Sequence, residues 1–273
     1  MPDLDTYRNW GIELERRLRL RSHPLAIRLL EDETEIPDDA VRPSADEGRR
    51  LSLCQAFARS RREGETVAMF GEDMWCFEPV VGYGLEEPPA DFLDGDNRYP
   101  RDVATRKAGR RYAAEFPKLD PDRYVGLVSA PMGSTPFLPH VVTTYLDSEQ
   151  LSLLLLGREY RGGENLTCPL SAHAACVYGV VPAIQEGRCQ VAVPCRGDRY
   201  AAMASSEEMI ATVPTQELGP IDGRSLADVM DGLKEIEETG STLPGGRRLQ
   251  SEYELPESYE RIASGMEYFK EAD

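Results

Sequence analysis

The sequence predicts an α+β protein with a mixed β-sheet, several surrounding helices and a C-terminal docking helix. Strand-length apolar runs and amphipathic runs at helical spacing both occur along the 273-residue chain. They are interleaved irregularly, which favours α+β over the regular alternation of a doubly wound fold. The hydrophobic fraction of 41% and the charged fraction of 29% are typical of a globular protein.

The first part of the chain predicts two helices and two strands. Asp5 or Thr6 can cap a helix in which Trp10, Leu14 and Leu18 repeat at helical spacing. Residues 24–30 form a strand-length apolar run, and residues 66–70 form a second one. Between them, the stripe that contains Cys54 predicts a helix ending near residues 63–64.

The middle of the chain contains its best strands. Residues 79–89 are rich in Gly and Pro and predict loop or short turns, whereas residues 101–116 have helical character. Residues 124–130 and 141–146 are β-branched runs, and both predict strands.

Later elements follow from capping patterns and short runs. Asp147 with Gln150 predicts a capping box for a helix over 148–160. The last of the predicted elements are a helix over 169–181, a strand over 190–193, a second capping box at Ser205 and Glu208, and helices over 222–238 and 256–272.

The predicted domain organisation is a single α+β domain over 1–239, a linker over 240–250 and a docking helix over 251–273. The linker is indicated by the Gly/Pro-rich residues 240–246. In the last helix an apolar stripe docks onto the body or onto a second copy in a homo-oligomer: Tyr259, Ile262, Met266 and Phe269.

Charge and end composition exclude several classes of protein. The 31 Lys+Arg against 48 Asp+Glu give a net charge of −17, which excludes nucleic-acid binding by a basic field. No apolar window reaches the roughly 18 residues of a membrane span. An acidic, polar start lacks the pattern of a secretory signal, so a cytoplasmic location is expected. In a reducing cytoplasm the six cysteines are expected as thiols, metal ligands or redox groups.

Common catalytic motifs are missing from the sequence. It contains no dinucleotide loop, Walker loop, zincin pair, EF-hand or nucleophile elbow. His23, His140 and His173 are isolated from one another in sequence, which favours structural or solvent-facing roles over catalysis.

Spacing limits which cysteines can share one centre. Cys168 and Cys176 would lie about 12 Å apart along a helix starting at Pro169. Cys189 and Cys195 would lie roughly 20 Å apart along an extended strand. One thiol from each pair therefore remains, beside Cys54 and Cys76.

We select Cys54, Cys76, Cys176 and Cys195 as metal ligands, with Cys168 left open as an alternative to Cys176. Four thiolates suit a 4Fe–4S cluster or, as the alternative, a structural zinc. No two of these cysteines form a CxxC pair, so folding must assemble the site. Cys54 and Cys176 also lie in apolar stretches, where a thiol can simply pack in the core.

Cys168 and Cys195 carry further chemical hypotheses. Cys168 precedes the predicted helix at Pro169, whose dipole would favour a reactive thiolate. Cys195 is followed by Arg196, Gly197 and Arg199, which predict a tight turn that suits a carboxylate or phosphate ligand. Surface ion pairs of these arginines with Glu207 and Glu208 are the structural alternative.

Several stretches taken in order resemble domain-of-unknown-function family 169. The resemblance extends from about Leu18 to Leu233 and is carried by residues 24–29, residues 54–59, Cys76 with Gly82 and Gly84, residues 130–131, residues 139–142, residues 197–199, residues 207–209 and residues 213–214. It implies an architecture and no reaction. It implies leading roles for Cys54 and Cys76 and for Gly197 and Arg199, while His140 stands where an acidic residue is expected.

Three functions follow as hypotheses from different classes. The first is an iron–sulfur protein for redox or sensing chemistry, whose partner is a redox protein or a small molecule. The second is a protein that binds an anionic small molecule through Arg196 and Arg199. The third is a thiol enzyme with Cys168 or Cys195 as nucleophile, although no histidine is placed by sequence as its base.

Overall fold

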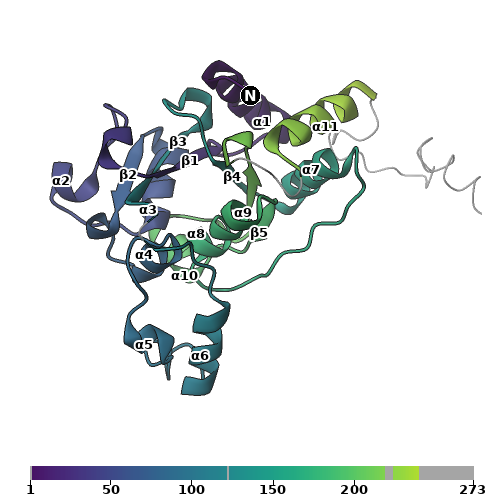
Figure 1. Cartoon of the computed structure of the whole chain (residues 1–273). Helices are drawn as coiled ribbons and strands as arrows, with labels where there is room; N and C mark the ends of the chain where they lie inside the picture. The colour runs from purple at the N-terminus through teal and green to yellow at the C-terminus, as the bar shows by residue number, and fades with distance from the viewer. Residues whose placement is uncertain (1, 122, 219–223, 240–273) are drawn as a thin grey trace, which may run out of the picture.

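A six-stranded β-sheet forms the centre of the computed structural model, which describes residues 2–121, 123–218 and 224–239 (Figure 1). The strand order is β2-β3-β1-β4-β6-β5, and all neighbouring strands run antiparallel. The strands are β1 (Leu25–Leu30), β2 (Val67–Phe70), β3 (Gly126–Pro131), β4 (Val141–Leu146), β5 (Gln190–Ala192) and β6 (Met209–Pro214).

The α+β class is confirmed. The expected mixed sheet is corrected, because every pair of neighbouring strands is antiparallel. Among the described residues, parallel pairing is limited to two isolated bridges, Val41 with Val67 and Leu51 with Met74. The helices between the strands do not act as crossovers between parallel neighbours, because each strand meets its neighbours in opposite directions.

Side chains alternate between the two faces of the sheet, and helices cover both faces. In β1, Leu25, Ile27 and Leu29 join one buried cluster, while Ala26 and Leu30 join the other. Three helices pack together on the second of these faces, in the upper half of Figure 1: α1 (Leu4–Leu18), α7 (Ser148–Glu159) and α11 (Leu226–Thr239). The helix α1 begins earlier than expected, because the Asp3 side chain caps it by accepting from the Thr6 N–H.

The opposite face carries short helices, several of which lie around the candidate site. They are α3 (Leu53–Ala58), which continues into a π-helical turn (Arg59–Glu63), α4 (Phe77–Gly82), α8 (Ala175–Tyr178), α9 (Val181–Glu186) and α10 (Arg196–Ala201). The helix α2 (Pro43–Glu47) lies near the β2 edge of the sheet.

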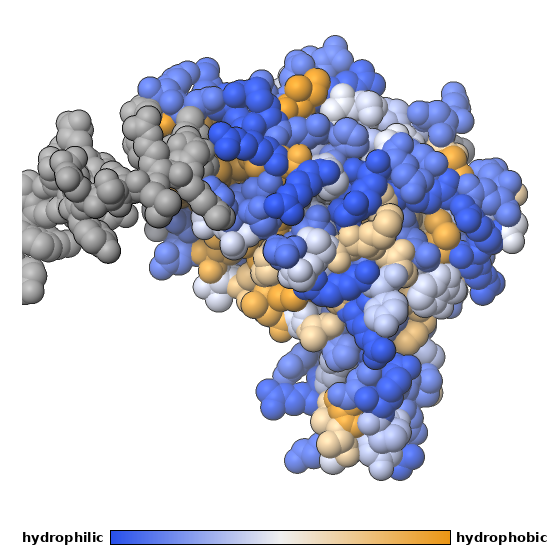
Figure 2. All heavy atoms as spheres, turned by 180° about the vertical axis from the view of Figure 1, so that it is seen from behind, coloured by the Kyte–Doolittle hydropathy of each residue, from blue (hydrophilic) through white to orange (hydrophobic). Residues whose placement is uncertain are grey.

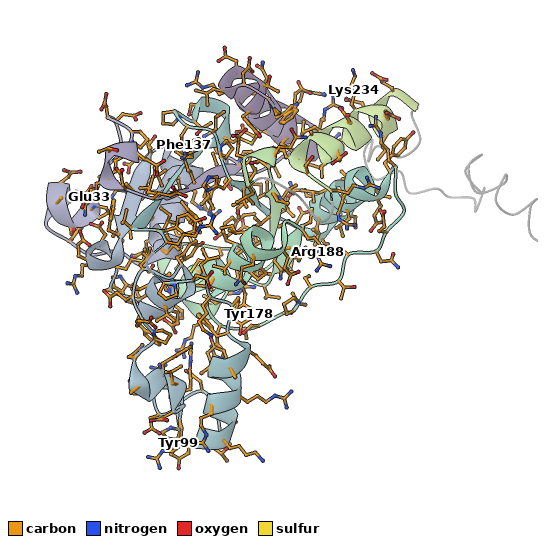
Figure 3. All side chains as sticks on the ribbon, viewed as in Figure 1. Glu33, Tyr99, Phe137, Tyr178, Arg188 and Lys234 are labelled. Atoms are coloured by element: carbon orange, nitrogen blue, oxygen red, sulfur yellow. The ribbon has the colours of Figure 1, made fainter. Side chains whose placement is uncertain are left out.

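A small helical lobe projects from this face. It contains α5 (Ala90–Leu93) and α6 (Arg106–Glu115), which lie at the bottom of Figure 1, and the same projection is visible from behind in Figure 2. Phe92 joins the lobe to the body, with ring centroids 5.8 Å from Phe77 and 5.3 Å from Phe116. Figure 3 places Tyr99 at the far end of the lobe and Tyr178 near its junction with the body.

Three expectations about loops and helices are corrected. Residues 79–82 belong to the helix α4, although residues 79–89 were expected to form loop or turns; residues 83–89 have no helix or strand, as expected. The helix expected over 169–181 begins only at Ala175, after Ala174 adopts a left-handed backbone with φ 45° and ψ 51°. The expected tight turn at 195–199 is the start of α10, with Cys195 as its N-cap residue.

A strand replaces the structure expected after the second capping box. The Ser205 N–H does donate to Glu208 Oε2 at 2.8 Å, as in a capping box. The chain then enters β6, because Ile210 and Val213 are buried and pair with Tyr145 and Val142 of β4. Tertiary burial therefore overrides the local capping pattern.

Two sequence predictions concern the ends of the chain and its surface. The linker over 240–250 and the docking helix over 251–273 lie outside the described residues. In the described part, none of the helices combines the length and the apolar character needed to cross a membrane. The face shown in Figure 2 is largely hydrophilic, which agrees with the net charge of −17.

Candidate functional site

A cavity of about 950 Å³ lies on the lobe side of the sheet. Its walls come from the segments around α3, α4, α8 and α10 and from the lobe residues 98–102. All four cysteines selected from the sequence line it: Cys54, Cys76, Cys176 and Cys195. Residues separated by more than 140 positions in the chain therefore face one space.

Each thiol enters the cavity from the start of a short helix. Ser52 caps α3 and forms a capping box with Gln55. Cys54 lies two residues after Ser52, and the Cys54 Sγ is 3.1 Å from the Ser52 Oγ. Cys76 is the N-cap residue of α4, and Cys195 is that of α10.

Cys176 is fixed by backbone contacts. It lies in the first turn of α8, and its carbonyl oxygen accepts a 2.8 Å hydrogen bond from the Tyr83 hydroxyl. Tyr83 follows directly after α4, so this bond ties the α4 segment, which begins at Cys76, to the α8 segment.

Gly197 provides space between two of the thiols. A Cβ atom at this position would lie 3.7 Å from Cys195 Sγ and 3.9 Å from Cys54 Sγ. The two sulfurs thus approach one point from two different helices. Their convergence is what a shared centre requires.

Burial favours the protonated form of three of these thiols, Cys54, Cys76 and Cys176, by raising their pKa values. Burial raises the pKa of Cys54 to about 12, and the negative charge of Asp198 contributes. Burial also raises the pKa of Cys76, with a contribution from Glu78. The pKa of Cys176 is raised mainly by burial, and its neighbours Cys54, Cys195 and Cys76 contribute.

A carboxylate held by an arginine lies beside Cys76. The Cys76 thiol donates to Glu78 Oε2 over 2.8 Å, and Arg98 donates to the other oxygen, Oε1, over 2.7 Å. Arg98 also donates to Asp102 over 3.0 Å and stacks 4.6 Å from the centroid of the Tyr112 ring. The lobe therefore supplies the group that orients Glu78.

A second set of buried charges lies behind Cys54. Asp198 has no exposed surface, and the Tyr145 hydroxyl donates to its two oxygens over 3.2 and 3.1 Å. The Arg61 guanidinium stacks 4.0 Å from the centroid of the Tyr145 ring and lies 3.5 Å from Glu208. Burial raises the pKa of Asp198 to about 7, although Arg61 and Tyr145 oppose this effect.

The other two cysteines lie elsewhere. Cys168 and Cys189 pack against the apolar cluster on the opposite face of the sheet, with α1, α7 and α11. No helix begins at Pro169, so the helix-terminal environment expected for Cys168 is absent from this part of the structure. Between Cys168 and Cys176, it is Cys176 that lines the cavity.

The two arginines of the stretch 195–199 lie in different environments. Arg196 and Gly197 line the cavity, whereas Arg199 donates to the Ser205 carbonyl and is not among the lining residues. Of the anion-binding pair expected from the sequence, Arg196 alone faces the cavity.

The histidines have structural contacts in the described regions. His140 Nδ1 accepts from the Leu29 N–H at 3.2 Å, and burial lowers the pKa of His140 to about 4. His23 Nδ1 lies 2.7 Å from Glu15 Oε1. His173 lines the cavity and contacts the Tyr112 ring edge-on.

In the ranges 2–121, 123–218 and 224–239, no three His, Cys, Asp or Glu side chains are already drawn together closely enough to hold a single metal ion. The thiols share a cavity without forming a closed coordination shell.

Sequence reasoning did not assign roles to Glu78, Arg98, Arg61 or Asp198. Asp198 lies within the stretch 195–199 that attracted notice for its arginines, and Glu78 is two residues from Cys76. Their closeness in sequence to a selected cysteine was the one sign of a role at the site. Their burial could not be predicted, because it depends on segments far away in the chain.

Comparison with known proteins gives one match. The family model of DUF169, described as uncharacterised ArCR, matches residues 13–221. No curated protein and no solved structure matches the chain.

Proposed function

The chain belongs to DUF169, the family of uncharacterised ArCR proteins, and on that premise we propose that it is a cysteine-ligated metal protein holding an iron–sulfur cluster for redox or sensing chemistry. The observation that carries the proposal is the convergence of four thiols on one cavity: Cys54, Cys76, Cys176 and Cys195. Four cysteine ligands are the number that a 4Fe–4S cluster uses.

The size of the cavity supports a cluster over a single zinc ion. A single zinc ion needs four sulfurs at about 2.3 Å from one point, which is a much smaller space than the cavity of about 950 Å³. Sulfur-only ligation suits iron–sulfur chemistry as well as zinc. Zinc therefore stands as the alternative occupant.

The surroundings suit a centre that carries negative charge. Thiols whose pKa values are raised by burial must lose their protons to bind a metal, so uptake releases protons and strengthens as pH rises. Glu78 can accept the proton of Cys76, to which it is already hydrogen-bonded. Arg98, Arg101 and Arg196 line the cavity and would offset the charge of four thiolates.

When bound, such a cluster would accept and donate single electrons. The chain's own residues would set its environment: Arg98 fixes Glu78 beside one ligand, and Asp198 adds a buried charge near Cys54. Both are means by which a protein tunes a reduction potential.

The test is metal and sulfide analysis of protein purified without oxygen. We expect iron and acid-labile sulfide in equal amounts. We also expect the broad absorbance at about 400 nm that is typical of such clusters. Each of the variants C54S, C76S, C176S and C195S should lose most of the iron. C189S and C168S are the matched controls, one buried and one half-buried, and should keep it.

Three results would decide otherwise. Colourless protein without iron or zinc would overturn the proposal. If the two control variants lost as much iron as the other four, the assignment of the four selected cysteines as ligands would be wrong. Zinc without sulfide would keep the cysteine-ligated centre and exclude the redox role.

A thiol-dependent enzyme is the second candidate, favoured by the 2.8 Å bond from Cys76 to Glu78, which gives this thiol a carboxylate base. The raised pKa of Cys76 leaves little thiolate at neutral pH, which is why we place this function second. Metal-free protein with one rapidly alkylated cysteine at position 76 would favour it.

A further inference from the structure

The mouth of the cavity contains aromatic side chains that the thiol centre does not require. Trp75 is 56% exposed and Tyr200 is 84% exposed, and both line the cavity from separate segments. The indole N–H of Trp75 donates to Gln55 Oε1 over 3.1 Å, which restrains the ring while leaving much of it in solvent. Exposed aromatic surface around a concave site is typical of ligand binding.

Positive charge accompanies these rings. The Arg196 guanidinium lies 5.7 Å from the centroid of the Tyr200 ring, and the ion pairs formed among the described residues do not include it. The Arg101 side chain is 69% exposed and is paired with Asp102. This concentration of arginine is notable in a chain with a net charge of −17.

The carboxylates of the lining are already engaged. Glu78 accepts from Cys76 and Arg98, and Asp102 accepts from Arg98 and Arg101. A cationic ligand would find no free carboxylate among these lining residues, whereas an anion would meet Arg196. The charge at the mouth therefore selects an anion.

We propose that the cavity mouth binds a small aromatic carboxylate, with its ring against Trp75 and Tyr200 and its carboxylate on Arg196. The three groups are a pair of exposed aromatic faces and a guanidinium placed beside one of them. A cavity of about 950 Å³ has room for such a ligand. This site shares the cavity of the proposed metal centre but goes beyond it, because its ligand contacts Trp75, Tyr200 and Arg196 and none of the four sulfurs.

The experiment uses the fluorescence of Trp75 as the probe of its own site. The chain has two tryptophans, and Trp10 packs edge-on against Tyr7 with ring centroids 5.5 Å apart, on the opposite face of the sheet. In a Trp10→Phe background, titration with benzoate at constant ionic strength should change the Trp75 emission in a saturable way. Acetate, which lacks the ring, and benzyl alcohol, which lacks the charge, should each bind more weakly.

Variants separate the two contacts. Arg196→Gln should raise the benzoate dissociation constant by about tenfold, because it removes a charge-assisted contact. Tyr200→Leu should raise it several-fold. Both side chains are exposed, so neither change threatens folding. Arg123→Gln is the matched control, because Arg123 is exposed and also lies on a tyrosine ring, 5.0 Å from the centroid of Tyr124, outside the cavity.

The inference is overturned if benzoate gives no saturable change, or if Arg196→Gln binds benzoate as well as the parent does. Equal responses to benzoate and to benzyl alcohol would show that the ligand carboxylate does not contribute to binding, and would also overturn the inference. Iron content is measured on the same preparations. Benzoate binding without iron would refute the metal centre alone, and iron without benzoate binding would refute this site alone.

Discussion

Asp198 shows at the scale of one residue how this fold holds a charge that its surroundings only partly compensate. Burial raises its pKa, whereas Arg61 and the Tyr145 hydroxyl lower it, and the result is about 7 against an ordinary value of 3.8. The group is three residues after Cys195 and contributes to the raised pKa of Cys54. A carboxyl that changes charge near neutral pH thus lies behind the thiol cavity.

This environment predicts a particular pH dependence of stability. Between about pH 4 and pH 7 the folded protein keeps a proton that the unfolded chain has released, so the free energy of unfolding falls as pH rises through this range. Asp198→Asn should remove that contribution. The difference in the free energy of unfolding between wild type and variant should change by at most about 4 kcal/mol across this pH range.

Urea unfolding of both proteins at several pH values measures this difference, because all other groups titrate in both. Parallel stability curves for wild type and Asp198→Asn would contradict the assignment.

The close contact of α4 with α8 shows at the scale of elements why two of the thiols meet. A Cβ atom at Gly82 would lie 2.5 Å from Val177 Cγ1, which is closer than side-chain carbons approach in proteins. The absence of a side chain at Gly82 therefore permits the contact. Since Cys76 is the N-cap residue of α4 and Cys176 lies in α8, the same contact holds together the two segments that carry these thiols.

Gly82→Ala should therefore destabilise the protein by about 1–3 kcal/mol, because the added methyl group must push the helices apart. Alanine would suit the helical backbone by itself, so a loss of stability reports packing. Gly133→Ala is the control, because a Cβ there meets Ile12 at an ordinary 3.4 Å. Urea unfolding of the two variants is the measurement, and equal effects at both positions would show that the α4–α8 contact is not the cause.

At the scale of the whole molecule, the acidic charge opposes compaction. The chain has a net charge of −17, while many of its ion pairs involve exposed side chains, which contribute little to stability. Around the cavity the balance is reversed, with Arg98, Arg101 and Arg196 facing Glu78 and Asp102. The lining therefore has more arginines than carboxylates where anionic groups are proposed to bind.

Added salt should consequently stabilise the folded protein. Screening reduces repulsion among the surplus carboxylates, and the Debye length falls from about 30 Å at 0.01 M to about 8 Å at 0.15 M. We expect the melting temperature to rise over this range of NaCl, as measured by circular dichroism. A falling melting temperature would mean that the surface ion pairs outweigh the net repulsion.

Much of the fold could be predicted from local sequence, and the reasons are visible in particular elements. The strands β1, β3 and β4 and the helix α7 follow their apolar runs and capping box closely, because each is buried along its length or fixed by its own cap. β6 and the start of α8 are two places where the local patterns misled. β6 forms because it pairs with β4, and α8 begins only after the left-handed Ala174.

The sequence by itself determined only that Cys54, Cys76, Cys195 and one of Cys168 and Cys176 were candidates for a shared centre, since spacing along the chain argues against using both thiols of a close pair. Only the tertiary structure decided that Cys54, Cys76, Cys176 and Cys195 line one cavity and that Glu78, Arg98 and Asp198 surround them. The physical reason is that strand and helix periodicities act over a few residues. Burial and charge pairing, in contrast, join segments that lie far apart in the chain, and no local pattern records them.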